Sequence, residues 1–359
     1  MNLTDIANIR LVSQQIAATK LRTAKDMVGW MGAIQAQDYA MAKWAIGVRL
    51  PNSIDRDIET AITNGEIIRT HLLRPTWHFV SADDIYWLLE LTAPQIKASL
   101  KSRHKELGLS ETIFAKSHTI IKTTLSGGKH ATREELVAEL EKAEIATNGN
   151  RASHLLAQAE LDGLVCSGAT KGGKQTYALL EERVPKTKSL TREEALATLA
   201  QKYFTSHGPA TLQDFAWWSG LSAGEAKLAL EMVKPDFASE TINAQTYWFA
   251  GSYSRPKADK EAVFLLPAFD EFIISYKDRS AVLPYQNHKL TVSNNGMFRP
   301  VIVVNGQVVG IWKRVIKKDR VIVETELFDQ ANTTTKSLIE KALAQYGSFL
   351  DKKTEITHK

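Results

Sequence analysis

Cysteine is almost absent from this chain of 359 residues, in which Cys166 is the only example. One cysteine can form neither an internal disulfide bond nor a cysteine-based zinc cluster, and this fits a reducing compartment. Long hydrophobic runs are also missing, since no apolar stretch approaches the roughly 20 residues that a membrane-spanning helix needs. The first residues, Met1 to Asp5, carry no charged-then-apolar leader. We therefore expect a cytoplasmic protein with no metal site and no membrane partner.

The excess of charge of one sign is small, because 45 Lys and Arg residues stand against 40 Asp and Glu residues, a net charge of +5. This balance permits a basic surface for an anionic partner without requiring one. The chain is long enough for two or three domains, and its hydrophobic residues, 44% of the total, suffice to bury their cores. Composition thus indicates a folded, soluble protein and leaves the kind of activity open.

Two glutamines one residue apart, Gln35 and Gln37, follow the first long apolar helix pattern and precede Asp38. Positions i and i+2 of a continuous helix point about 200° apart, so the two amides share a pocket only if the helix stops between them. An extended or turn backbone would put them on one side. Spacing alone favours a helix end whose amides satisfy loose backbone groups, and a polar pocket is the alternative. Asp38 either caps the next helix or supplies basicity.

Pairs of short helices followed by a pair of strands recur along the chain, which is the element order of a winged helix. The three copies fall at 39–62 with 66–80, at 132–161 with 164–179, and at 211–233 with 241–250. The tetrad Thr-Arg-Glu-Glu also occurs twice, at Thr132 and at Thr191. We predict an α+β fold of tandem winged-helix (helix-turn-helix) units over 1–118, 119–185 and 186–255, followed by a β-hairpin-rich domain over 256–359.

The last hundred residues contain a strong hairpin signal, Asn305-Gly306, between the β-like runs 297–304 and 307–314. A two-residue turn there would place Arg299 opposite Trp312 and Phe298 opposite Lys313.

Dense charges precede this hairpin. We expect an ion-pair network that positions the β-rich domain, with Asp270 also a weaker catalytic candidate; its members are Asp270, Lys277, Asp278 and Arg279. The pair Trp217-Trp218 lies in the middle of an expected helix and is interpreted as core packing.

Six segments spread over almost the whole chain form a set: Ile9-Arg10-Leu11, 32–38, 69–78, 266–272, 276–279 and 295–300. In this order they resemble the winged-helix DNA glycosylases of the AlkZ/YcaQ type, which unhook DNA crosslinks and remove N7-alkylated guanine. The glutamine-apolar-glutamine motif resembles the AlkZ-like branch, because the YcaQ branch has glutamine-apolar-aspartate. The resemblance implies a C-shaped molecule with duplex DNA along a basic concave face, catalytic residues Gln35 and Gln37, and a DNA-engaging hairpin that maps onto 297–314.

Neutral catalytic residues suit such a substrate. A glutamine has no useful pKa and cannot act as a general base in the usual sense. An N7-alkylated guanine already carries positive charge and leaves the sugar readily, so amides that hold a water and stabilise the developing sugar cation are sufficient. We therefore expect a monofunctional, water-using DNA repair glycosylase that needs no cofactor, with Asp38 as a weaker catalytic candidate.

Cations on the expected wings and on the C-terminal hairpin are the candidate DNA contacts. They are Arg69, His71 and Arg74 on the first wing, Lys171 and Lys174 on the second, and Arg299, Lys313 and Arg314 on the hairpin. The expected partner is double-stranded DNA, bound by a monomer associated with the nucleoid.

Two alternatives remain, a non-catalytic winged-helix DNA-binding protein or transcriptional regulator and a family member whose activity has decayed. A regulator would need base-reading residues on its recognition helices. The helix expected over 54–62 offers Arg56 among three acidic residues, and the one over 221–233 is short of Arg and Asn.

Overall fold

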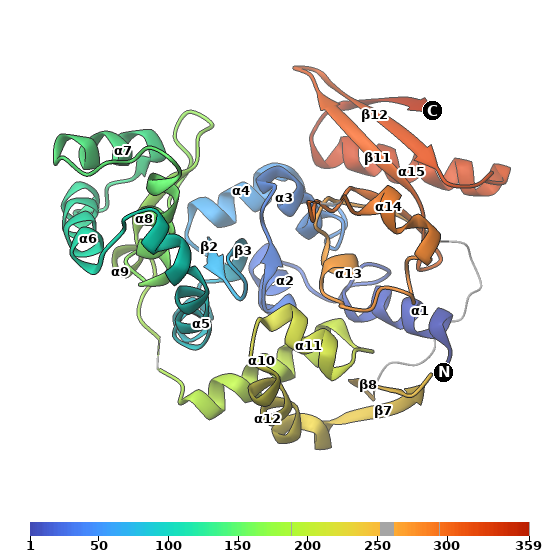
Figure 1. The fold of residues 1–359 in the computed structure, drawn as a ribbon. Helices are drawn as coiled ribbons and strands as arrows, with labels where there is room; N and C mark the ends of the chain where they lie inside the picture. The colour runs from blue at the N-terminus through green and yellow to red at the C-terminus, as the bar shows by residue number, and fades with distance from the viewer. Residues whose placement is uncertain (188, 252–261, 294, 359) are drawn as a thin grey trace.

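The computed structural model describes residues 1–187, 189–251, 262–293 and 295–358, and the chain is a mixed α+β protein (Figure 1). In the N-terminal part, helix α1 (Leu3–Ser13) precedes a unit with the order helix, strand, two helices, two strands. The elements of this unit are α2 (Ala24–Met31), β1 (Ile34–Gln35), α3 (Tyr39–Gly47), α4 (Asp55–Thr63), β2 (Ile67–Leu72) and β3 (Thr76–Ser81). The three strands form a sheet of order β1-β3-β2, in which the first strand pairs with the third.

The same element order occurs twice more. Helix α5 (Ile85–Glu106) connects the first unit to α6 (Glu111–Leu125), β4 (Ala131–Thr132), α7 (Arg133–Lys142), α8 (Arg151–Leu161), β5 (Val165–Ser167), β6 (Thr176–Leu179) and α9 (Leu180–Arg183). The strand order β4-β6-β5 is that of the first sheet. The third unit contains α10 (Arg192–His207), α11 (Leu212–Ser219), α12 (Ala223–Val233), β7 (Phe237–Ile242) and β8 (Gln245–Ala250). There, an isolated bridge between Ala210 and Trp248 takes the place of the first strand.

The repeated tetrad turns out not to mark equivalent positions. Both Thr132 and Thr191 close a capping box with the glutamate three residues later. However, α7 follows the first strand of its unit, whereas α10 is the first helix of its unit. The match therefore reflects a common way to start a helix. The predicted boundary between the first and second units, after residue 118, falls inside α6 and therefore does not separate two units. The predicted boundary at 255/256 lies outside the described residues.

The C-terminal part is a five-stranded sheet of order β13-β12-β11-β10-β9, with α15 (Thr333–Phe349) packed against it. Its strands are β9 (Val263–Leu266), β10 (Val301–Val304), β11 (Gln307–Ile316), β12 (Arg320–Leu327) and β13 (Lys353–His358), and the short helices α13 (Glu271–Ile274) and α14 (His288–Thr291) lie between β9 and β10. Strand β13, parallel to β12, was not predicted.

This sheet and the first unit share one hydrophobic core. The ring of Trp44 on α3 lies 5.0 Å from that of Tyr346 and 5.1 Å from that of Phe349, both on α15. The Trp44 indole N–H also donates to the carbonyl of Leu265 on β9, at 2.8 Å. The C-terminal part is therefore fixed relative to the glutamine segment.

The Asn305–Gly306 hairpin forms, but its register differs from the prediction. A β-bulge between Ile302 and Val303 shifts the pairing by one residue, and β10 begins only at Val301. The predicted pairs Arg299 with Trp312 and Phe298 with Lys313 are therefore wrong.

The position of this hairpin differs as well. Gly306 is buried against α1, where an added Cβ atom would lie 2.9 Å from the Cβ atom of Ala7. The turn thus rests on α1 instead of projecting into solvent. The projecting hairpin is the next one, β11–β12, whose end bears the exposed side chains of Val315 and Ile316, and Figure 1 shows it extending from the upper right of the molecule.

No helix in the described ranges is both long and apolar enough to cross a bilayer.

Candidate active site

The backbone of the glutamine segment is extended, as the sequence argument required. Helix α2 ends at Met31 because Gly32 adopts a φ of +76°, a conformation that glycine tolerates best. Residues 34–35 then pair with β3, with Gln35 opposite His78. The next N–H, that of Ala36, donates to the carbonyl of Trp77 at 2.7 Å. The helix therefore stops before both glutamines.

The two amides have different surroundings. Gln35 is 5% exposed, and its Oε1 accepts a hydrogen bond from Nη2 of Arg74 at 3.2 Å. Gln37 is exposed, and within the described residues its amide has no hydrogen-bond partner. One amide is thus held by the protein, and the other is open to a ligand.

Asp38 caps α3. Its Oδ1 accepts the backbone N–H of Met41 at 3.0 Å, which confirms the capping interpretation. Nη2 of Arg314 on β11 approaches the same carboxylate at 3.6 Å. This contact joins the segment to the projecting hairpin.

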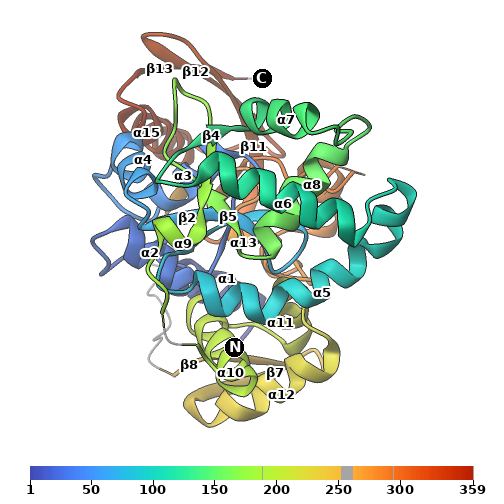
Figure 2. The ribbon, with the colours of Figure 1, turned by 90° about the vertical axis from the view of Figure 1, so that its left-hand side faces the viewer.

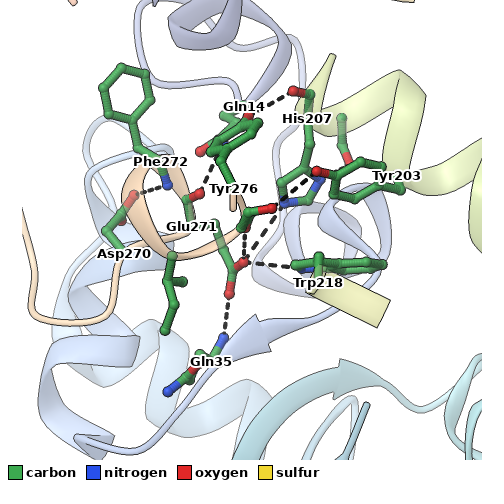
Figure 3. A network of polar contacts seen from close by, with 12 residues as sticks. Gln14, Gln35, Tyr203, His207, Trp218, Asp270, Glu271, Phe272 and Tyr276 are labelled. Carbon is green, nitrogen blue, oxygen red and sulfur yellow. Dashed lines mark hydrogen bonds and ion pairs between the residues drawn. The ribbon is translucent and has the colours of Figure 1, made fainter. Parts of the chain in front are cut away.

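A buried carboxylate holds the glutamine strand from the other side (Figure 3). Glu271, 1% exposed, accepts the backbone N–H of Gln35 at 2.6 Å through Oε1. Its Oε2 accepts the indole N–H of Trp218 at 3.2 Å and the hydroxyl of Ser275. Nε2 of His207 lies 3.8 Å from the same oxygen.

The donors around Glu271 keep it ionised. Burial alone would raise the pKa of this carboxyl group, but the nearby His207, the Ser275 hydroxyl and the Gln35 N–H outweigh burial and lower its pKa to about 2. A permanently charged acceptor thus fixes the strand that carries the motif. The sequence reasoning gave Glu271 no role, although it lies in one of the segments that carry the family resemblance.

Arg69 supports the motif instead of reaching the surface. It is 9% exposed, and its Nε and Nη2 atoms both donate to the carbonyl of Ala36 at 3.0 Å. The guanidinium also lies 4.0 Å from the ring centroid of Trp77. His71 is likewise engaged internally, by the carboxylate of Glu160. The position of Arg69 therefore contradicts its predicted role as a DNA contact, because the side chain is buried.

Four of the remaining candidate cations lie at the surface, whereas Arg74 and Arg314 are half-buried. Lys171 and Lys174 flank the β5–β6 turn, where their ammonium groups lie 2.6 Å from Glu135 and 3.6 Å from Glu134, respectively. Arg299 is exposed just before β10, and Lys313 is exposed on β11.

The predicted ion-pair network does not form as proposed. Asp270 makes a two-pronged pair with Arg49 of the first unit, at 2.8 and 2.9 Å, and both side chains are fully buried. The backbone N–H groups of Lys277 and Asp278 instead donate to the carboxylate of Asp214. In the part of the chain that the structure describes, no ion pair joins Asp270 to the other three members.

The Arg49–Asp270 pair leads to a stability prediction. Replacing Asp270 with alanine leaves the Arg49 guanidinium buried without its carboxylate, so we expect a loss of about 3–5 kcal/mol in the free energy of unfolding. Urea unfolding followed by circular dichroism would measure it. A loss below about 1 kcal/mol, the size of a surface ion pair, would contradict this structural role.

Trp217 corrects the interpretation of the tryptophan pair. Trp218 is fully buried, as expected, but Trp217 is 40% exposed. Its ring centroid lies 5.7 Å from the guanidinium of Arg74 and 5.6 Å from that of Arg279. Arg279, a predicted network member, therefore contacts an exposed aromatic ring.

The family model described as DNA glycosylase AlkZ-like matches residues 28–349, and the chain belongs to this family. A curated relative from Streptomyces sahachiroi, named "Interstrand DNA cross-link repair glycosylase", is 23% identical in an alignment of length 335, and the match covers 89% of this chain and 89% of the relative.

A solved structure has the same fold. The structure of Streptomyces sahachiroi DNA glycosylase AlkZ matches with a TM-score of 0.82 at 19% sequence identity, covering 99% of this chain and 100% of that one.

Proposed function

We propose that this glycosylase hydrolyses the N-glycosidic bond of N7-alkylated guanine in duplex DNA, including guanine held in an interstrand crosslink. The name of the Streptomyces sahachiroi relative, an interstrand DNA cross-link repair glycosylase, supports this choice of substrate. The observation that carries the proposal is the Gln35–Gln37 segment, extended, fixed by Glu271, and open at Gln37.

The two amides have separate tasks in this proposal. Gln37, exposed, has both its carbonyl and its amino group free to hold a water beneath the anomeric carbon. Gln35 accepts a hydrogen bond from Arg74, which holds the segment in position. Its amide dipole stabilises the positive charge that develops on the sugar. The lesion supplies its own leaving-group activation, so no lysine Schiff base and no metal is needed. Glu271 and Arg69 act through the backbone, since they bind the N–H of Gln35 and the carbonyl of Ala36.

We further propose that the three repeated units are winged helices arranged in a C shape around the duplex, and that the protein binds DNA as a monomer near the nucleoid. The end of β5–β6 with Lys171 and Lys174, and the end of β11–β12, lie on the same upper side of the molecule in Figures 1 and 2. A duplex lying on that side would meet cations at both ends. For a crosslinked base this open approach matters, because a tethered base cannot be flipped into a closed pocket.

The projecting hairpin leads to a binding prediction. Lys317 and Lys318 lie at its end, and neither side chain makes an ion pair among the residues described here. Replacing both with glutamine should weaken binding to any duplex similarly and reduce the slope of log K against log salt by about two, since each lysine displaces roughly one counterion. Fluorescence anisotropy at several salt concentrations would measure this.

The control for that pair is Lys336 with Lys341, two exposed lysines on α15, replaced with glutamine in the same way. An unchanged salt slope in the hairpin variant, or an equal change in the control, would contradict the role of the hairpin.

The proposed reaction is tested by incubating the protein with a duplex carrying one N7-methylguanine and, separately, with a guanine–guanine interstrand crosslink. Chromatography should detect the released base, and alkaline cleavage should detect the abasic site that remains. Strand breakage without alkali would instead indicate a lyase.

A further inference from the structure

Trp217 is held in place although much of its surface is open. Its indole N–H donates to the carbonyl of Ile274 at 3.0 Å, which fixes the orientation of the ring. The side chain nevertheless remains 40% exposed. A tryptophan that the fold orients and leaves accessible is suited to stacking on a planar ligand.

Segments far apart in the sequence build the surroundings of this ring. The turn between α11 and α12 approaches the first unit so closely that a Cβ atom added to Gly220 would lie 2.3 Å from the carbonyl oxygen of Leu73. This contact sets Trp217 next to Arg74. On another side, Arg279 lies 5.1 Å from the ring centroid of Phe298, and its Nε donates to the carbonyl of Ile273.

No carboxylate among the described residues directly contacts either arginine. Within the described part of the chain neither Arg74 nor Arg279 makes an ion pair, and Nε of Arg74 is buried without a hydrogen-bond partner. Burial lowers the pKa of both guanidinium groups, and the charge of Arg74 lowers the pKa of Arg279 further. The nearby carboxylates of Glu271, Asp214 and Asp278 lie beyond ion-pair contact. A bound anion in direct contact with both guanidinium groups would compensate their charges more fully than these carboxylates do.

We propose that Arg74, Trp217 and Arg279 form a receiving site for one nucleotide displaced from the duplex, with its base stacked on the indole and its phosphate between the guanidinium groups. A nucleotide combines a planar aromatic group with an anion, and an arginine pair binds phosphate well. Because Arg74 also donates to Gln35, the site adjoins the glutamine segment. This inference rests on the proposed function, and where the lesion is a crosslinked base the displaced nucleotide would be an untethered neighbour of that lesion.

Two substitutions at Trp217 test the site. Trp217→Leu removes the aromatic surface, whereas Trp217→Phe keeps a stacking ring and loses the N–H. Base stacking on an aromatic side chain is worth roughly 1–3 kcal/mol, so Trp217→Leu should bind a duplex containing N7-methylguanine about 5- to 150-fold more weakly. Trp217→Phe should retain most of the affinity. The matched control is Tyr285→Leu, which removes an aromatic ring that is 89% exposed elsewhere on the surface.

Intrinsic fluorescence provides a readout independent of catalysis. DNA should quench the wild-type emission more than that of Trp217→Phe, because a stacked base quenches the indole. Equal affinity of Trp217→Leu and Tyr285→Leu, or equal losses in the leucine and phenylalanine variants, would overturn the proposal. Wild-type protein that releases no base but shows the Trp217-dependent quenching would refute the proposed reaction and retain this site. Normal base release by the wild type, together with unchanged DNA binding and quenching in the Trp217 variants, would support the proposed reaction and refute this site.

Discussion

Replacing Gln35 and Gln37 together with alanine should lower the single-turnover rate of base release by about 100-fold or more, while duplex binding remains largely intact. The expected decrease in rate follows from the loss of groups that position the water and stabilise charge in the transition state. Binding is retained because the cations at the ends of the hairpins are untouched. The assay measures free N7-methylguanine at saturating protein, so that affinity does not enter the rate.

The two single variants should differ. Gln37 is exposed and unpartnered in the described structure, so Gln37→Ala should lose rate without losing stability. Gln35 is buried against Arg74, so Gln35→Ala should lose both. Gln201→Ala, which alters an exposed glutamine on α10, is the control and should match the wild type. A double variant that releases base at the wild-type rate would show that neither glutamine takes part in catalysis.

Replacing Glu271 with alanine should be the most damaging single change to the site. It leaves the N–H of Gln35, the indole N–H of Trp218 and the hydroxyl of Ser275 without their acceptor in a buried place. We expect a loss of about 3–5 kcal/mol in the free energy of unfolding. A displaced β1 should also lower the rate of the folded protein on the order of 100-fold, as a misplacement of about 1 Å can. Urea unfolding and single-turnover assays at low temperature separate the two effects.

Glu271→Gln provides the matched comparison and a dependence on pH. The folded pKa of Glu271 is about 2, against an ordinary value of 4.5, so its ionisation stabilises the fold above pH 4.5 and ceases to do so as the pH falls toward 2. The stability difference between wild type and Glu271→Gln, up to about 3 kcal/mol, should therefore shrink on acidification. A folded Glu271→Ala protein with the wild-type rate would show that Glu271 does not position the motif.

Local patterns in the sequence predicted much of the fold. The spacing of Gln35 and Gln37 indicated a helix end at the motif, and the structure places that end a few residues earlier, at Met31. The order of helices and strands predicted the repeated units, because each element carries its own capping and turn residues. Strand β13 was missed because its partner β12 lies on the other side of α15 in the sequence. The bulge between Ile302 and Val303 was missed because the turn signal at Asn305–Gly306 does not indicate such an irregularity in the strands.

The site was less predictable for the same reason. The immediate sequence neighbours of Asp38 were enough to predict that it caps α3. Glu271 acts on Gln35 across 236 positions, and only the packing of α13 on β1 brings them together. Arg69 looked like a surface cation, but its neighbours in space make it a buried support. Trp217 and Trp218 are adjacent in the sequence, yet only one is buried.

The alternative of a non-catalytic regulator loses support from two findings. The chain belongs to a DNA glycosylase family over residues 28–349, and its glutamine segment is intact and braced by buried charges.

The central claim, that neutral amides act on a lesion already charged, is tested most directly by the pH dependence of base release. The measurement is the single-turnover rate of N7-methylguanine release by wild-type protein between pH 5.5 and 8.5. Because glutamine amides do not titrate in this range, the account predicts release with a rate that is nearly constant across it. A rate that follows the titration of an acid or base, or no release at any pH, would contradict it.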